Sequence, residues 1–299
     1  MKNWFWRIIS VILLCWTVNI FYYQSKQLEE PIVLNTYIDM PSSEHASFKL
    51  FYLTNKNDVI ELDSLQINGY TYSNENSWFP WFGELSAQSY RQEFSHHFLK
   101  EASFTLTEEG LGNVNEGVQT DNIFAHFTNG QIIPVKVDKL ALTPSKEEVS
   151  IFSSPSSFST NNHVEAVLLK VEEPVSMNPI ELPDLVQQHK DLKVMVWKDS
   201  KGVSTAFREL ANTPWNQLDA PLYTEVNWPL QIEPVDSVAL FFHTKESLND
   251  IKFISAFQPW TGKTLDGKVV SHDIYIKHEP WLTQEQVNAL LKKARGEAK

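Results

Sequence analysis

The chain of 299 residues is 42% hydrophobic and 21% charged, a composition that excludes an intrinsically disordered protein. Its formal net charge of −12 repels phosphate backbones, so we expect no nucleic-acid partner. The single cysteine, Cys15, excludes disulfides within the chain and cysteine-ligated metals in the residues after it. Together with the absence of Asn-x-Ser/Thr acceptors, this favours a bacterial protein.

The chain opens with an apolar segment. Residues 8–23 contain no charge and one amide, Asn19, and aromatic residues flank the segment at both ends, as in a helix that spans a bilayer. A cleaved signal peptide needs small residues after the apolar run, whereas bulky residues follow here. A lipoprotein site needs a small residue where Leu14 precedes Cys15. We therefore predict an uncleaved signal anchor, with a cleaved signal and a lipid anchor as alternatives.

The positive charges around this segment predict its orientation. Lys2 and Arg7 precede the span, whereas Lys26 is followed by acidic residues, which places residues 1–7 in the cytoplasm. The linker 24–30 and everything after it are then extracytoplasmic, at the cell membrane within the cell envelope. A partner helix in the bilayer would contact Asn19, and the alternative is a tolerated polar residue near the helix end.

From residue 31 onward the hydrophobic pattern has mostly a period of two, which is typical of half-buried strands. Turn-forming clusters of Asn, Asp, Gly, Pro and Ser separate these runs. The expected strands include residues 47–54, 131–142, 163–174, 192–199, 237–244, 250–257 and 272–279. Because no long helix intervenes, we predict a mainly β fold with one or two antiparallel β-sandwich domains. A proline-marked segment divides the expected domain 1 (31–175) from domain 2 (176–280).

Three segments refine this prediction. The alternation slips by one residue near Asp138, which predicts a β-bulge or a strand end there. Residues 83–100 carry aromatic residues at a spacing of four, which fits a helix face and equally a strand. Residues 281–299 predict an amphipathic helix, with Thr283 and Gln286 at the spacing of a capping box. Its apolar stripe is expected to pack on the second sandwich.

The most unusual segment is SWFPWFGEL, residues 77–85. Its proline removes a hydrogen-bond donor and argues against a buried central strand. Such a loop either plugs the open end of a sandwich, or dips into the outer leaflet, or is exposed as an anchor for a partner protein or a sugar chain. The candidate binding residues are Trp78, Phe79, Trp81 and Phe82. Further tryptophans beside proline or turn residues favour a tryptophan-lined surface: Trp215, Trp228, Trp260 and Trp281.

The sequence contains few features of an enzyme. Motifs of serine hydrolases, zinc proteases, P-loop NTPases and dinucleotide-binding proteins do not occur, so we predict no cofactor. The adjacent His96 and His97 diverge in a strand or a helix, so we predict no metal site. Acidic residues near aromatic segments are the candidates for a carboxylate-dependent hydrolase: Glu75, Glu84, Asp121 and Glu165.

The favoured function is non-enzymatic binding of an envelope partner protein or a wall polysaccharide. The alternatives are an accessory subunit of a membrane complex and an extracytoplasmic hydrolase.

Overall fold

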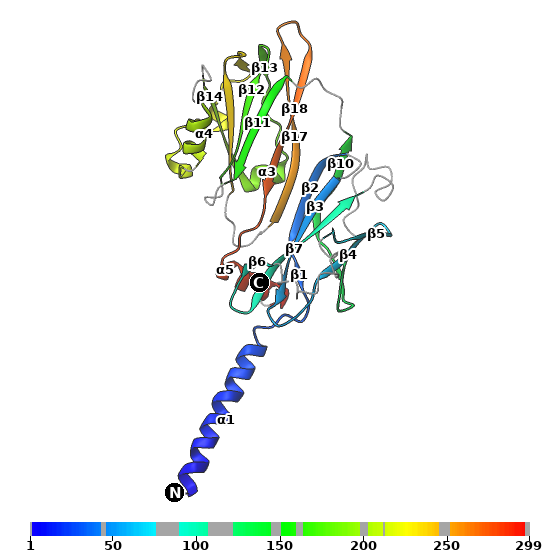
Figure 1. Cartoon of the computed structure of the whole chain (residues 1–299), viewed down its shortest axis with the longest axis vertical. Coiled ribbons are helices and arrows are strands. Elements are labelled where there is room, and N and C mark those ends of the chain that lie inside the picture. Colours follow the sequence, from blue (N-terminus) through cyan, green and yellow to red (C-terminus); the bar gives the residue numbers. More distant parts are fainter. Residues whose placement is uncertain are drawn as a thin grey trace.

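The computed structural model describes residues 2–42, 46–75, 90–106, 122–144, 151–159, 164–197, 203–211, 213–244 and 252–296. Helix α1 (Lys2–Gln24) projects from one end, and two stacked β-sandwiches follow it along the long axis (Figure 1). A short helix near the C-terminus, α5 (Gln284–Ala294), lies at the end of the sandwiches that is next to α1. This arrangement confirms the predicted fold class.

Helix α1 projects away from the sandwiches, and its side chains are mostly exposed (Figure 1). The window Trp6–Gln24 is long and apolar enough to cross a membrane, and none of it is buried inside the structure. The hydroxyls of Ser10 and Thr17 donate to carbonyls one turn earlier, which satisfies these polar groups within the helix. Such a helix fits a membrane anchor and a signal sequence equally. The uncleaved anchor and its orientation therefore stay predictions.

The first sandwich, next to α1, is built mainly from two four-stranded sheets. Residues of the six-stranded sheet described below also contribute to its core. One sheet contains, in spatial order, β1 (Ile32–Val33), β3 (Ala46–Asn55), β7 (His97–Leu106) and β6 (Tyr90–Glu93). Another contains β5 (Tyr70–Ser73), β4 (Leu62–Ile67), β8 (Ile123–Phe127) and β9 (Ile132–Pro134). Their facing apolar residues form one hydrophobic core.

The second sandwich has its own core between two sheets. One sheet contains β11 (Phe152–Ser159), β12 (Val164–Val171), β16 (Ser237–Thr244) and β14 (Lys190–Trp197). The other contains β10 (Val137–Pro144), β2 (Asn35–Ser42), β17 (Lys252–Thr264), β13 (Val175–Met177), β15 (Leu230–Ile232) and β18 (Val269–His278). Helix α4 (Val203–Ala211) covers the outer face of the first of these sheets, and α3 (Asp184–His189) precedes β14.

Strand β17 joins the two sandwiches. It pairs along one edge with β18, and along the other first with β2 and then with β13. Because side chains alternate along a strand, Phe253 enters the first core while Ile254 and Ala256 enter the second. The pairs β2–β17 and β2–β10 are parallel, which the sequence did not predict. The chain can form them because most of the first sandwich intervenes as a long connection.

Local predictions from the sequence agree with the structure in most places. Each of the seven expected strand segments contains a strand. The pairing of β10 with β2 shifts between Val137 and Lys139, which confirms the irregularity predicted near Asp138. The described part of 83–100 forms strands β6 and β7, so the helical alternative is wrong there. Strands β11 and β12 share a sheet with β16, and the number of domains stays a prediction.

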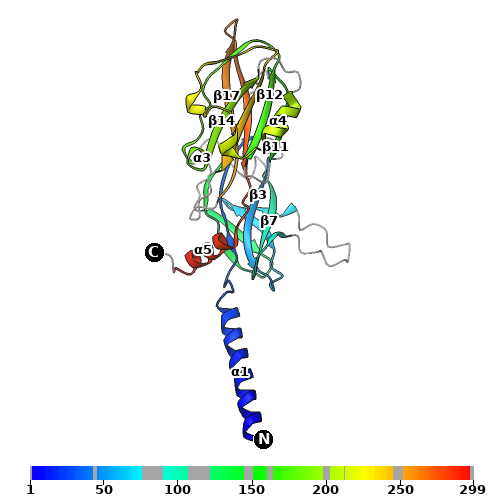
Figure 2. The ribbon, with the colours of Figure 1, turned by 90° about the vertical axis from the view of Figure 1, so that its left-hand side faces the viewer.

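The C-terminal helix was predicted correctly, but its packing was not. Thr283 and Gln286 form the capping box. The apolar stripe packs on the first core rather than the second, through Val287 and Leu291. The physical reason is a pair of hydrogen bonds between the Gln92 side chain of β6 and the backbone of Leu282, at 2.8 and 3.1 Å. Figure 2 shows α5 beside the first sandwich.

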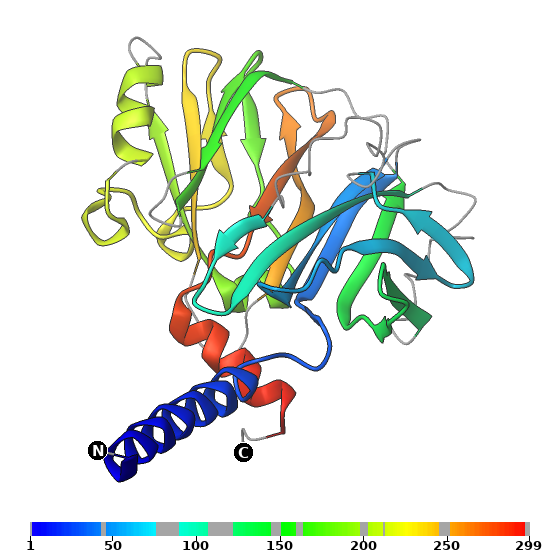
Figure 3. The same ribbon diagram turned by 60° about the horizontal axis from the view of Figure 1, so that its bottom comes forward.

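The linker after α1 is docked on the base of the first sandwich. The Asn55 amide accepts from the backbone N–H of Leu28 at 2.8 Å and donates to its carbonyl at 3.0 Å. The His97 ring donates from Nε2 to the Lys26 carbonyl at 3.0 Å. Arg295, just after α5, donates to the Gln27 carbonyl at 3.2 Å. The end of α1, the linker and α5 therefore meet at one end of the molecule (Figure 3).

We expect acidification to destabilise the fold through His97. Burial of the ring, which is 1% exposed, lowers the pKa of His97 from 6.5 to about 4. Because Nε2 carries the proton given to Lys26, protonation adds an N–H at Nδ1, where the described residues offer no hydrogen-bond partner. The unfolded chain takes up a proton near pH 6.5 and the folded chain only near pH 4. The contribution of the neutral His97 to the free energy of unfolding is therefore fully present above pH 6.5. It is lost as the pH falls through the window from 6.5 to about 4, by on the order of 2 kcal/mol.

Urea unfolding of the full chain in detergent, followed against pH, measures this effect. His97→Gln keeps an N–H for the Lys26 carbonyl and removes the titration. The variant should lose stability less steeply than the wild type as the pH falls through the window. His96→Gln, at the neighbouring half-buried ring, is the matched control and should stay closer to the wild-type slope than His97→Gln does. Equal slopes for the wild type and His97→Gln would contradict the prediction.

Candidate functional site

The predicted binding stretch, Trp78, Phe79, Trp81 and Phe82, lies outside the described residues. Before this stretch in the chain lies Asn74, a buried residue that donates to the Leu62 carbonyl at 2.8 Å. After it comes strand β6, whose first residue, Tyr90, stacks on Phe98 at 4.4 Å between ring centroids. Asn19 is exposed on α1. The binding role of the aromatic stretch and the contact of Asn19 with a partner helix both stay predictions.

The four tryptophans beside proline or turn residues, Trp215, Trp228, Trp260 and Trp281, do not share a surface. Trp260 is completely buried in the second core, donates to the Asn178 carbonyl at 2.7 Å, and meets the edge of Trp228. Trp215 stacks on His243 on the outer side of the second sandwich. Only Trp281 is largely exposed among the four, at 59%. The tryptophan-lined surface expected from these residues is therefore wrong, because a neighbouring proline marks a turn and not exposure.

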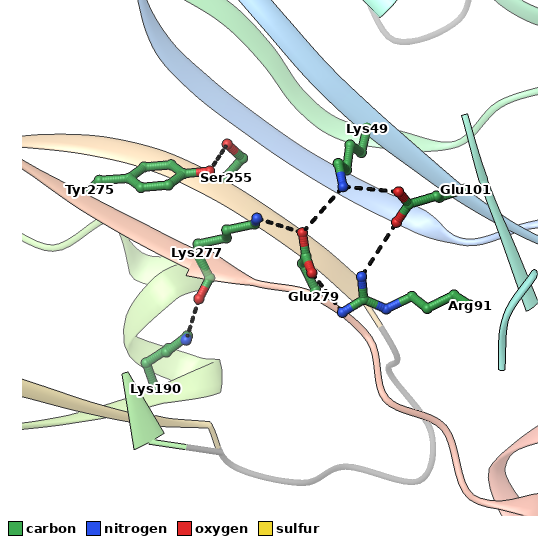
Figure 4. Close-up of polar contacts among 8 residues, drawn as sticks. All are labelled: Lys49, Arg91, Glu101, Lys190, Ser255, Tyr275, Lys277 and Glu279. Carbon is green, nitrogen blue, oxygen red and sulfur yellow. Dashed lines mark hydrogen bonds and ion pairs between the residues drawn. The ribbon is translucent and has the colours of Figure 1, made fainter. Parts of the chain in front are cut away.

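A cluster of charged residues lies where the two sandwiches meet (Figure 4). Glu279, just after β18, contacts Lys277 at 2.5 Å, Arg91 at 2.6 Å and Lys49 at 3.9 Å. Glu101 of β7 contacts Lys49 at 3.0 Å and Arg91 at 3.3 Å. We call these five residues the junction cluster. Its ion pairs join strands of the first sandwich to the end of β18 in the second.

The strand pairing explains how this cluster forms. Glu101 lies opposite Phe51 in the β3–β7 ladder. The pairing of β6 with β7 shifts between Tyr90 and Gln92, so Arg91 has no counterpart in the ladder. A bulge of this kind re-aims the side chain, and the Arg91 guanidinium lies over the Phe51 ring at 5.3 Å from the centroid. This bulge could not be predicted from the sequence, because the four residues of β6 are too few to reveal a slip in alternation.

An aromatic pair lies beside the junction cluster on the same face of β18. Tyr275 stands two residues before Lys277, so both side chains point the same way. Its ring stacks on Phe257 of β17 at 4.6 Å, and its hydroxyl lies 3.3 Å from that of Ser255. Tyr275 is 40% exposed. We call Tyr275, Phe257 and the junction cluster together the junction face.

The electrostatics of the junction face suit binding better than acid–base chemistry. Burial alone would raise the pKa of Glu279, but ion pairs with Lys277 and Arg91 outweigh it, so the pKa lies below its usual value. The carboxylate therefore stays ionised near neutral pH and has no proton to give. Three cations against two carboxylates leave one positive charge on an acidic chain. Together with an exposed tyrosine, this charge fits a polar or anionic partner.

The two predicted carboxylates that the structure describes, Glu75 and Glu165, are not brought together. Glu84 and Asp121 lie outside the described residues. Glu75 accepts from Thr105 in the first sandwich, whereas Glu165 pairs with Lys190 inside the second at 3.0 Å. Burial raises the pKa of Glu165. Such a shift is typical of catalytic acids, but here the carboxyl is tied to a completely buried ammonium.

Among the described residues, no three His, Cys, Asp or Glu side chains come together as a group that could hold a metal ion. His97 is buried and its ring lies 6.3 Å from that of His96, at an angle of 79°.

Comparison with known proteins shows no family. No family model matches the sequence, and no curated protein matches it. Among solved structures, the chain matches the MSCRAMM protein ACE of Enterococcus faecalis, which is described as binding its ligands by the collagen hug. The two chains are 9% identical, the match covers 85% of this chain and 95% of that one, and the TM-score is 0.21. A likeness of this size carries no argument about function.

Proposed function

We propose that this protein is a single-pass, membrane-anchored binding protein of the cell envelope, with its N-terminus in the cytoplasm and its β-sandwiches outside. Its ligand is an envelope partner protein or a wall polymer, and it is not an enzyme. The observation that supports this proposal most is the junction face, where an exposed tyrosine and three cations are held in place by both sandwiches.

Contacts between the parts of the chain favour a binding role. The docked linker, the shared strand β17 and the ion pairs at the junction connect each part of the described chain to the next. A preorganised surface loses little conformational entropy when a partner binds. Tyrosine and arginine are also the side chains that contribute most to binding at interfaces. In this proposal Trp78, Phe79, Trp81 and Phe82 supply further contacts, because the chain continues from them into β6 and Arg91.

Binding to isolated wall polymer and to solubilised envelope proteins tests the proposal, with the full chain in nanodiscs. We expect Tyr275→Ala to weaken binding about tenfold or more, as for a hot-spot residue. Tyr70→Ala, which removes another exposed tyrosine (53%) from β5, is the matched control and should bind like the wild type. Unchanged binding by Tyr275→Ala would exclude the junction face, and turnover of wall glycan or peptide would exclude a non-enzymatic role.

One observation favours a second function, an accessory subunit of a membrane complex. The apolar segment 8–23 of helix α1 is mostly exposed and carries one amide, Asn19, which can hydrogen-bond a partner helix in a bilayer. Replacing residues 8–23 with an unrelated span should then abolish co-purification of membrane proteins, and Asn19→Leu should weaken it. If the replaced chain still captures the same proteins, α1 serves only as an anchor.

A further inference from the structure

We propose that the last turn of α5 is a second membrane contact, which binds anionic phospholipid headgroups beside α1. This inference rests on the proposed anchoring of α1. It concerns a surface formed by Lys292, Lys293 and Arg295 with Lys26 of the linker, which we call the basic collar.

The position of the basic collar follows from contacts with the linker. Arg295 donates to the carbonyl of Gln27 at 3.2 Å, and Gln27 is three residues beyond the end of α1. Three residues span at most about 10 Å even when fully extended. The headgroup layer on each side of a bilayer is about 5–8 Å thick. A helix that ends at the membrane surface therefore brings Arg295 to the headgroups, and Figure 3 shows α5 beside the end of α1.

The charge of the basic collar contrasts with that of the chain. Lys292, Lys293 and Arg295 are all exposed, in a protein with a formal net charge of −12. Lys26 lies over the Tyr22 ring at 5.3 Å, where an interfacial tyrosine is expected. Among the described residues, the acids near the collar include the exposed Glu29 and Glu30 of the linker and Asp58, which accepts from the Asn55 amide that holds Leu28. The four cations of the collar outnumber these three acids. The helix dipole explains why cations are favoured in the last turn of a helix. It does not explain why the last turn of α5 lies against the linker that follows α1.

The fold presents these cations at a fixed height. Val287 and Leu291 bury one side of α5 in the first core, together with Leu282 just before the helix. The linker is held by Asn55 and His97. The backbone that carries the collar is thus already positioned when it meets lipid. Polybasic segments next to a span attract anionic headgroups in this way.

The test uses the full chain in nanodiscs, with Cys15→Ser and a fluorophore at Ala294→Cys, an exposed position in the same turn. The probe is a quencher attached to the headgroup of either phosphatidylglycerol or phosphatidylcholine. We expect quenching by the anionic lipid to exceed quenching by the zwitterionic lipid roughly fivefold or more at low salt, and this preference to fade at high salt.

Charge reversal separates the collar from general electrostatics. Lys292→Glu/Lys293→Glu should abolish the preference for the anionic lipid. Lys263→Glu/Lys268→Glu makes the same change in charge at the β17–β18 hairpin, at the opposite end of the molecule (Figure 1), and should leave it intact. The proposal is overturned if the wild type shows no preference, or if both double variants behave alike. Alkaline extraction reports separately on α1: a chain released from the bilayer would refute the anchor and the collar together, whereas a retained chain without preference refutes only the collar.

Discussion

Lys190→Met is expected to lower the free energy of unfolding by about 3–5 kcal/mol. The ammonium of Lys190 is completely buried, 3.0 Å from a carboxylate oxygen of Glu165, and donates to the Lys277 carbonyl at 2.8 Å. It therefore connects two strands of one sheet, β14 and β12, with the edge strand β18 of the facing sheet. Burial lowers the pKa of Lys190 and raises that of Glu165, against their mutual attraction. Removing the lysine leaves the carboxylate without its counterion.

Urea unfolding of single and double variants measures this effect. Lys190→Met/Glu165→Leu should recover most of the lost stability, because an apolar pair removes the unpaired charge. Lys56→Met breaks an exposed ion pair with Glu93 and should cost at most about 1 kcal/mol. If the double variant is as unstable as Lys190→Met, the loss comes from packing and not from the unpaired carboxylate.

Phe253→Ala is expected to cost about 3–5 kcal/mol, as for other buried phenylalanines. Its ring is 2% exposed and lies 5.1 Å from that of Phe51 in the first core. Its neighbour Ile254 faces the second core, so the truncation removes the aromatic contact through which β17 joins the first sandwich. We therefore expect the variant to separate the unfolding of the two sandwiches as well as to destabilise the chain.

Two spectroscopic measurements distinguish these effects. Tryptophan fluorescence includes the signal of Trp260 in the second core, and far-UV circular dichroism reports the overall β content. Their unfolding transitions should coincide in the wild type and diverge in Phe253→Ala. Phe207→Ala is the matched control, because Phe207 is equally buried and packs on Phe241 away from the junction. It should lose similar stability without separating the transitions. Coincident transitions in Phe253→Ala would show that the ion pairs and the strand pairing suffice to couple the sandwiches.

The candidate site could be predicted only in part. The aromatic stretch at 77–85 is visible in the sequence, but it lies outside the described residues. The junction cluster was missed because its members come from β3, β6, β7 and the end of β18, which are far apart along the chain. The bulge in β6 positions Arg91 at the cluster. The pairing of β18 with β17 positions Glu279, which directly follows β18. Neither depends on a local pattern that a single sequence displays.

The sequence by itself determined the apolar helix, the strand segments and the capping box at Thr283, because each depends on residues a few positions apart. Periodicity and capping act over one or two turns or a single strand. The tertiary structure decided which core each element joins. It placed α5 on the first core through Gln92, and it divided alternate residues of β17 between two cores. These choices depend on contacts between distant segments, whose free energy is set by packing after the chain has folded and is not encoded in any short pattern.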